Sequence, residues 1–191
     1  MPLIRECVVT TLTADGRPHI APLGLIEADA HWIVAPFRPS ATLDNLAATP
    51  KATASFTDDA LVFARLVTGD RALPLAAIPD WPAPRLGGAL AHAELEVVRN
   101  EADDVRPRFF CTVKRMQAHR PFLGMNRARA AVLEAAILAT RLGRLSPEKI
   151  ASEIAYLKIA IDKTAGEAER EAWEMVMAKI AAHFSSSDSQ S

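Results

Sequence analysis

The sequence has few of the features that point to a disulfide framework, a metal centre, nucleic acid or a membrane. Only two cysteines occur, Cys7 and Cys111, and they form no CxxC pair and lack the spacing of a zinc site. Acidic and basic residues nearly balance, 23 against 22, so no basic stripe is available to a phosphate backbone. No stretch approaches the roughly 20 apolar residues that span a bilayer. We therefore expect a soluble cytoplasmic protein with no metal, nucleic-acid or membrane partner.

What the chain does have is enough apolar sequence for a core. Its 191 residues are 50% hydrophobic, which suffices for one compact domain, or for a barrel with a helical appendage, without disulfides. The character of the sequence changes near Gly124, where alternating patterns give way to Ala-, Glu-, Leu- and Arg-rich helical periodicity. We predict a barrel domain over residues 1–122, a helical subdomain over 123–184 and a disordered tail over 185–191.

The first half predicts an antiparallel barrel or sheet. β-Branched residues, aromatic residues and the turn signal at Ala14-Asp15-Gly16 support strands at 7–12, 17–26, 31–36, 52–57, 91–99 and 108–115. Pro18 and Pro22 assign the second strand to an edge or a bulge, because proline cannot donate to a ladder. Short helices are predicted at 40–48 and 59–67. The proline- and glycine-rich segment 74–88 predicts a long irregular connection.

Three amphipathic helices are predicted in the second half. The first covers about 126–142, the second begins at the capping sequence Ser146-Pro147-Glu148, and the third begins near 167. Their expected buried faces are, in chain order, Val132, Ala136, Ile137 and Thr140; Ile150, Ile154, Leu157 and Ile161; and Trp173, Val176, Met177 and Ile180.

The segment 36–46, PFRPSATLDNL, combines an arginine with two hydroxyls at a helix start. Unpaired amides and the positive end of the helix dipole favour a phosphate there, and the Arg38 guanidinium can bind it bidentately. The alternative is that Ser40 or Thr42 only caps the helix and that Arg38 is a solvated charge.

Three further places could meet a ligand. Asp58 and Asp59, after Thr57, could bind a polyol or ring imide or could simply cap the next helix. His19 lies where a break in the second strand would free backbone amides for a planar ligand, although a lone strand histidine is usually structural. Asn126 and Arg127 open the first long helix, as a cap with surface charge or as part of a subunit interface. His31, His92, His119 and His183 show no neighbouring acid or cysteine that suggests a triad or metal centre.

Taken together, four segments in order resemble the FMN-binding split-barrel superfamily and, within it, the DUF447 family of flavoproteins. They are VVTTLTADGRPHIAPLGL, PFRPSATLDNL, the strand that ends in SFTDD, and the helical GMNRARAAVLEAAILATRL, and they cover nearly the whole chain. The implied fold class is mainly β with α: an FMN-binding split β-barrel followed by a C-terminal helical region.

The resemblance also implies a homodimer with FMN near the subunit interface. Carried over residue by residue, the phosphate would be held by Arg38, Ser40, Thr42 and Asn45. The ribityl chain and ring would be lined by His19, Ile20, Ala21, Pro22 and Leu23 together with Thr57, Asp58 and Asp59, and the partner subunit would contribute Asn126 and Arg127.

The function that the resemblance implies is an FMN-dependent oxidoreductase acting on a small molecule and linked to tetrahydromethanopterin or related one-carbon cofactor metabolism. The absence of a catalytic triad does not argue against this activity, because a flavin itself performs the redox chemistry. The alternative is a flavin carrier or sensor without turnover.

Overall fold

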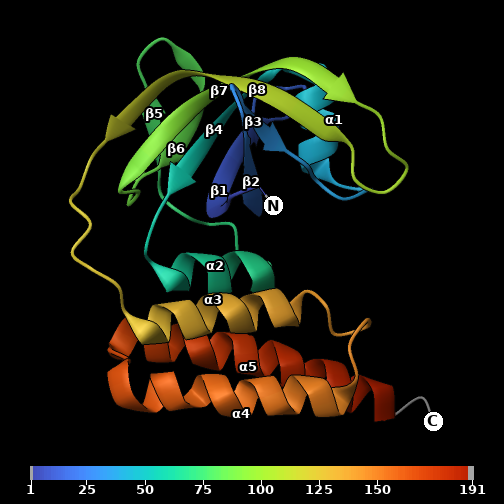
Figure 1. The fold of residues 1–191 in the computed structure, drawn as a ribbon, viewed down its shortest axis with the longest axis vertical. Coiled ribbons are helices and arrows are strands. Elements are labelled where there is room, and N and C mark those ends of the chain that lie inside the picture. The colour runs from blue at the N-terminus through green and yellow to red at the C-terminus, as the bar shows by residue number, and fades with distance from the viewer. Residues whose placement is uncertain (1, 189–191) are drawn as a thin grey trace. The chain divides into compact units, whose positions relative to one another are not determined.

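The computed structural model describes residues 2–188. The chain forms two compact units, and Figure 1 shows a β-rich unit and an all-helical unit. The β-rich unit contains the chain up to Thr57 and again Leu73–Phe122, and the helical unit contains Asp58–Ala72 and the chain from Leu123 onward. The sequence had assigned residues 58–72 to the barrel domain, whereas the structure groups them with the helices.

The β-rich unit is a closed six-stranded barrel, which confirms the predicted fold class. Its strands follow the order β1-β2-β3-β8-β7-β4, and every neighbouring pair is antiparallel. The strand bounds are β1 Ile4–Leu12, β2 Pro18–Ala28, β3 His31–Val34, β4 Lys51–Phe56, β7 Ala91–Glu101 and β8 Arg108–Ala118.

Strand β2 has one edge that is open over most of its length. It pairs with β1 over nine positions, Pro18 to Ile26, but with β3 over only three, Ile26 to Ala28. Two hydrogen bonds show which residues of β2 turn their backbone groups toward β1. The Glu27 amide donates to the Leu3 carbonyl, and the Thr13 amide donates to the Arg17 carbonyl, so these are the odd-numbered residues. Because antiparallel pairing alternates, even-numbered residues of β2 direct their backbone groups to the open edge. Pro22 lies in that set, so it falls where β2 has no partner strand on that side, although β2 belongs to a closed barrel and is not an edge strand.

The predicted irregular connection at 74–88 is wrong in part, because it contains a two-stranded sheet. Strands β5, Leu75–Ile78, and β6, Trp81–Leu86, pair with each other, and β6 contacts β4 and β1. Two bonds tie β6 to outward-facing hydroxyls of β4: Thr53 Oγ1 donates to the Ala83 carbonyl at 2.6 Å, and the Leu86 amide donates to Ser55 Oγ at 3.0 Å.

The barrel interior is closed at one end by helix α1, Ala41–Ala48, which joins β3 to β4. Leu43 and Leu46 of α1 pack into the same apolar cluster as Cys7, Val9 and eight further buried residues of the barrel lining. Both cysteines, Cys7 and Cys111, are free and fully buried in this cluster, as the sequence predicted. The helix contacts β1 and also β2, the strand that carries five other candidate site residues.

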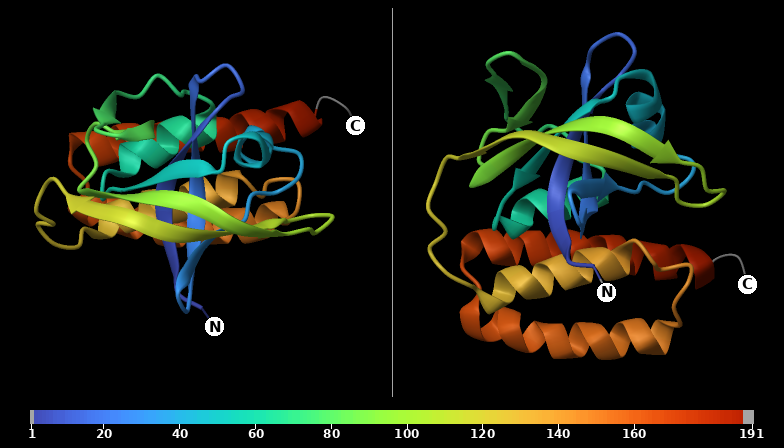
Figure 2. Two further views of the ribbon diagram at one scale, coloured as in Figure 1. Left: turned by 90° about the horizontal axis from the view of Figure 1, so that it is seen from above. Right: turned by 45° about the horizontal axis from the view of Figure 1, so that its top comes forward.

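The helical unit consists of four helices, and the three C-terminal ones run side by side in Figures 1 and 2. Their bounds are α2 Ala60–Thr68, α3 Arg127–Ala139, α4 Pro147–Thr164 and α5 Glu167–Asp188. An alanine-rich core holds them together, with Trp173, Val176 and Ile180 as its larger α5 members. The predicted faces of α4 and α5 are buried at Ile150, Ile161, Trp173, Val176 and Ile180 and partly buried at the others, Ile154, Leu157 and Met177.

Two features of the second half differ from the sequence expectations. The core face of α3 is a stripe of alanines with Val132, and Thr140 is its exposed C-cap residue rather than a buried one. Helix α5 reaches Asp188, so residues 185–188 of the predicted disordered tail are helical, and 189–191 lie outside the described residues. Within the described part of the chain, no helix combines the length and apolar character needed to cross a membrane.

Candidate functional site

The start of α1 is the centre of the candidate site. Ser40 is the N-cap in an extended conformation, and its Oγ accepts a bond of 3.3 Å from the Leu43 amide. Amides of the first helical turn have no acceptor within the helix, so those of Ala41 and Thr42 are available to a ligand or water. The predicted capping and the predicted anion site therefore coexist, because Ser40 satisfies one amide and leaves the helix start electropositive.

The side chains of Thr42 and Asn45 face inward from the same helix. Thr42 is 2% exposed and Asn45 is 6% exposed, and Asn45 Nδ2 donates to Thr11 Oγ1 of β1 at 2.9 Å. Asn45 therefore braces α1 against β1. Thr11 is also the ladder partner of His19, so the structure brings Asn45 and His19 to the same part of the barrel.

Arg38 lies before the helix and is held by the connection between β7 and β8. Its Nε donates to the Asp103 carbonyl at 3.1 Å, and its amide donates to the Val105 carbonyl at 2.9 Å. A second arginine of that connection, Arg106, donates from Nε to the Ala35 carbonyl at 2.8 Å. Sequence reasoning missed Arg106, because its proximity to the α1 start depends on a contact between segments 71 residues apart.

Asp103 organises this connection. Its Oδ1 accepts from the amides of Arg106 and Val105, and these bonds, with the charges of Arg108 and Arg38, lower the pKa of its carboxyl group. The carboxylate is therefore ionised at neutral pH and fixes the loop that holds Arg38. The segment that leads into α1 therefore carries one guanidinium, that of Arg38, and is contacted by a second, that of Arg106, which bonds to Ala35 and lies 4.9 Å from the centre of the Phe37 ring.

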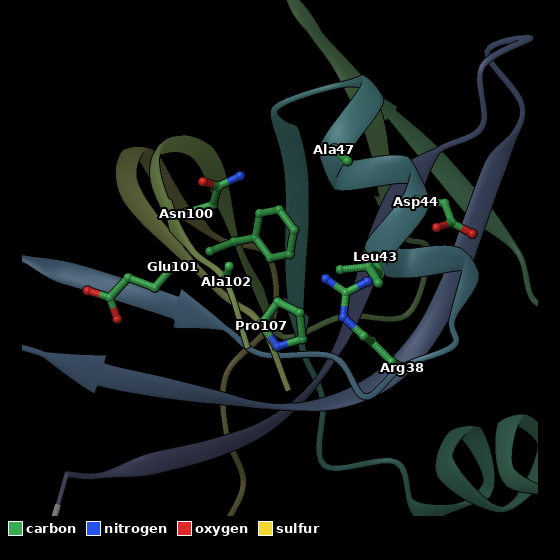
Figure 3. A pocket seen from close by; sticks show the side chains of 9 residues that line it. Arg38, Leu43, Asp44, Ala47, Asn100, Glu101, Ala102 and Pro107 are labelled. Atoms are coloured by element: carbon green, nitrogen blue, oxygen red, sulfur yellow. The ribbon is translucent and has the colours of Figure 1, made fainter. Parts of the chain in front are cut away.

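A cavity of about 210 Å³ adjoins Arg38 on the side of α1 that faces β7 and β8. Figure 3 shows the guanidinium turned toward Leu43 and Pro107, with Asp44 on the helix and Glu101 across the cavity. Two carboxylates and one cation make this cavity a poorer anion site than the helix start itself. The cavity is also smaller than the roughly 300–1,000 Å³ of sites that enclose a drug-sized ligand, so it could take only part of a flavin nucleotide.

The five candidates on β2 do not share one face. His19, Ala21 and Leu23 pair with Thr11, Val9 and Cys7, and they therefore face the barrel side of the strand. Ile20 and Pro22 face the opposite way, and Pro22 directs its carbonyl to the part of the β2 edge that has no partner strand. A ligand at this edge would meet backbone carbonyls and the Gly24 amide more than a row of five side chains.

The remaining candidates lie at the end of β4 and in the helical unit. Thr57 is the last residue of the barrel segment, while Asp59 caps α2 by accepting from the Leu61 amide at 3.0 Å. Asp58 forms an ion pair with Arg129 of α3. Capping, the simpler of the two alternatives, is thus observed for Asp59, and ligand contacts by these residues stay a prediction.

Asn126 caps α3, and Arg127 begins it. Asn126 Oδ1 accepts from the amides of Ala128 and Arg129 at 2.8 and 3.1 Å, and its Nδ2 donates to the Thr164 carbonyl at 3.1 Å. Arg127 is exposed at the first position of the helix. The capping interpretation of Asn126 is confirmed, and a role at a subunit interface is untested.

One polar cluster was overlooked in the sequence. His92 and Glu94 alternate on β7 and therefore share a face, and His92 Nε2 lies 3.5 Å from Glu94 Oε1. On its other side, His92 Nδ1 lies 2.8 Å from Nε2 of His119, with the two rings stacked. His92 therefore has an acidic neighbour that the sequence analysis did not weigh, and the His-x-Glu spacing in a predicted strand was the signal; within the described residues this cluster forms no metal-binding group.

The closed barrel with a split between β2 and β3, capped by a helix with an electropositive start, is the fold of the flavin-binding split barrels. The chain belongs to the DUF447 family, which is described as a protein family of unknown function. The model of the family's N-terminal domain matches residues 5–120, and the model of its C-terminal part matches residues 126–178. A search of curated proteins finds no match to the chain.

Solved structures support the same fold. An FMN-bound DUF447 protein from Methanosarcina mazei is similar with a TM-score of 0.79 at 22% identity, over 94% of this chain and 96% of that one. An NADH:FAD oxidoreductase from Streptomyces globisporus has a TM-score of 0.51 at 17% identity, over 60% of this chain and 75% of that one. Flavoredoxin from Methanosarcina acetivorans has a TM-score of 0.53 at 13% identity, over 65% and 72%.

Proposed function

We propose that this chain binds FMN in its barrel unit and is an FMN-dependent oxidoreductase that acts on a small molecule. The observation that carries the proposal is the open edge of β2 beside the start of α1. These two features offer backbone donors and acceptors for a flat ring system and an electropositive end for a phosphate. The FMN bound to the DUF447 relative from Methanosarcina mazei supports this assignment.

The residues around α1 fit a phosphate group. Arg38 and Arg106 would supply charge-assisted bonds, and the amides of Ala41 and Thr42 would supply neutral donors. Ser40 Oγ already accepts from the Leu43 amide, so its hydroxyl proton remains available as a donor. Asn45 would act mainly by holding α1 against β1, since its amide group already donates to Thr11.

The open edge of β2 would hold the ring. Pro22 presents a carbonyl acceptor there and Gly24 presents an amide, whereas Pro22 has no N–H to leave unsatisfied. When bound, FMN would supply the hydride or electron transfer. The protein's contribution would be to orient the ring and to exclude water from one side of it.

We further propose that the activity is linked to tetrahydromethanopterin or related one-carbon cofactor metabolism, with a pterin or a related precursor as substrate, and that the protein is a homodimer. Both proposals rest on the resemblance of the four sequence segments to DUF447 flavoproteins. The cavity beside Arg38 is too small to enclose a complete flavin nucleotide, so a second subunit would be needed to complete the enclosure of the ligand.

Anaerobic reduction of the FMN-loaded protein tests the proposed activity. We expect NADH, NADPH or a tetrahydropterin to bleach the flavin absorbance within seconds, with a saturable dependence on donor concentration. A protein that binds FMN tightly but reacts with none of these donors faster than free FMN does would instead be a carrier or sensor.

A further inference from the structure

A shallow apolar groove lies between α3 and α4 in the helical unit. Small residues of α3, Ala130 and Ala131, and Ala160 of α4 form part of its lining, and Tyr156, Leu157 and Ile159 are its larger apolar residues. Its volume is about 220 Å³, which is below the roughly 300–1,000 Å³ of pockets that enclose drug-sized ligands. The groove therefore suits one or two apolar side chains better than a free small molecule.

The same unit exposes apolar side chains of matching character. Leu123 and Met125 are each 90% exposed, and Tyr156 and Ile159 beside the groove are 72% and 46% exposed. Tyr156 and Ile159 line the groove itself, and Leu123 and Met125 lie four and two residues before Arg127, another residue of the lining. Exposed apolar side chains that gather around a groove are typical of a protein–protein contact. The helical unit thus contains both protruding apolar residues and a groove able to receive them.

Charge at the groove favours a second copy of this chain over an unrelated partner. Arg127 and Glu134 both line the groove on α3, seven residues or about 10 Å apart along the helix. Within residues 2–188, neither side chain has an ion-pair partner. A two-fold axis that sets α3 antiparallel to its copy would bring each charge opposite its complement, so the surface is self-complementary.

We propose that this groove is a two-fold interface of the homodimer, in which Leu123 or Met125 enters the groove of the partner subunit and Arg127 pairs with Glu134 of the partner subunit. The contact is isologous, because each copy offers both the protruding residue and the groove, and it therefore closes at two subunits rather than forming a filament. The proposal goes beyond FMN binding and can be tested in its absence.

Charge reversal tests the interface in the apo-protein by analytical ultracentrifugation. Arg127→Glu and Glu134→Arg alone should each weaken the dimer at least about tenfold, since two-fold symmetry places like charges together twice. The double variant should restore dimerisation to near the wild-type level. Arg170→Glu, at an exposed position in the first turn of α5, is the matched control and should leave the dimer unchanged.

A second pair of variants tests the apolar contact. Leu123→Asp and Met125→Asp should shift the mass from near twice 20.7 kDa to near 20.7 kDa at micromolar concentration, with an unchanged circular dichroism spectrum. A monomeric wild type, or a dimer that all four variants leave intact, would overturn the proposal. FMN titration of Leu123→Asp and Met125→Asp distinguishes this proposal from the proposed FMN binding. If these variants remain dimeric and bind FMN tightly, the proposed interface is wrong but the proposed function still stands.

Discussion

At the scale of single residues, Arg38 is the candidate phosphate ligand whose position the structure defines best, and its contact with a phosphate stays a prediction. The sequence predicts it from its place before a helix, and the structure holds it there through the Asp103 and Val105 carbonyls. Because only Nε is bonded to Asp103, the terminal nitrogens of the guanidinium remain able to meet a phosphate.

Arg38→Ala should weaken FMN binding by about tenfold to a hundredfold, the effect of losing a hydrogen bond to a charged group. Fluorescence titration of the apo-protein measures this, and riboflavin binding should change much less because riboflavin has no phosphate. Arg17→Ala, an exposed arginine of the β1–β2 turn, should change neither. An unchanged FMN dissociation constant in Arg38→Ala would remove this residue from the site.

Both cysteines are predicted to be inert in the folded protein. Burial raises the pKa of the Cys7 thiol to about 12 and that of the Cys111 thiol to about 12, so the reactive thiolate is scarce at pH 8. A chromogenic thiol reagent should therefore label neither residue until denaturant is added. Stoichiometric labelling of the native protein within minutes would show that the barrel interior opens readily.

At the scale of elements, capping chemistry was the most reliable guide in the sequence. Ser40, Asn126 and Ser146 cap helices where their residue types predict it, because the cap depends on a few adjacent residues. Strand β6 was missed because Pro82 and Pro84 argue against a strand. It forms nonetheless, as one of the two strands of a small sheet. The bonds that hold it come from Ser55 and Thr53 of β4, which lie about 30 residues earlier in the chain and leave no local pattern.

Strand β7 makes the stability of the protein depend on pH through its histidine. Burial lowers the pKa of His92, with opposing effects from Glu94 and additional lowering by Arg85 and Arg115. Burial also lowers the pKa of its partner His119. As pH falls below about 6.5, the unfolded chain therefore takes up protons before the folded one does, and the free energy of unfolding decreases.

We expect urea unfolding to show lower stability at pH 5.5 than at pH 7.5, and His119→Gln to reduce that difference. His183→Gln, at an exposed position on α5, should retain the full difference. If His119→Gln and the wild type lose equal stability on acidification, the histidine pair is not the cause.

At the scale of the whole molecule, the sequence predicts a barrel followed by helices but not the composition of the helical unit. Residues 58–72 join that unit because Arg129 pairs with both Asp58 and Glu169, and because α2 packs on α3 and α5. Such pairings link distant segments and leave no local pattern. The open edge of β2 was foreseen only through its prolines, since the extent of pairing with β3 is also a non-local property.

Titration of the apo-protein with FMN and, separately, with riboflavin tests most directly whether the barrel unit is an FMN site with a phosphate-binding end, by quenching of flavin fluorescence. We expect one FMN per chain, a shifted flavin absorbance spectrum, and riboflavin binding at least about tenfold weaker, because riboflavin lacks one charge-assisted contact or more. No FMN binding, or equal affinity for the two flavins, would contradict it.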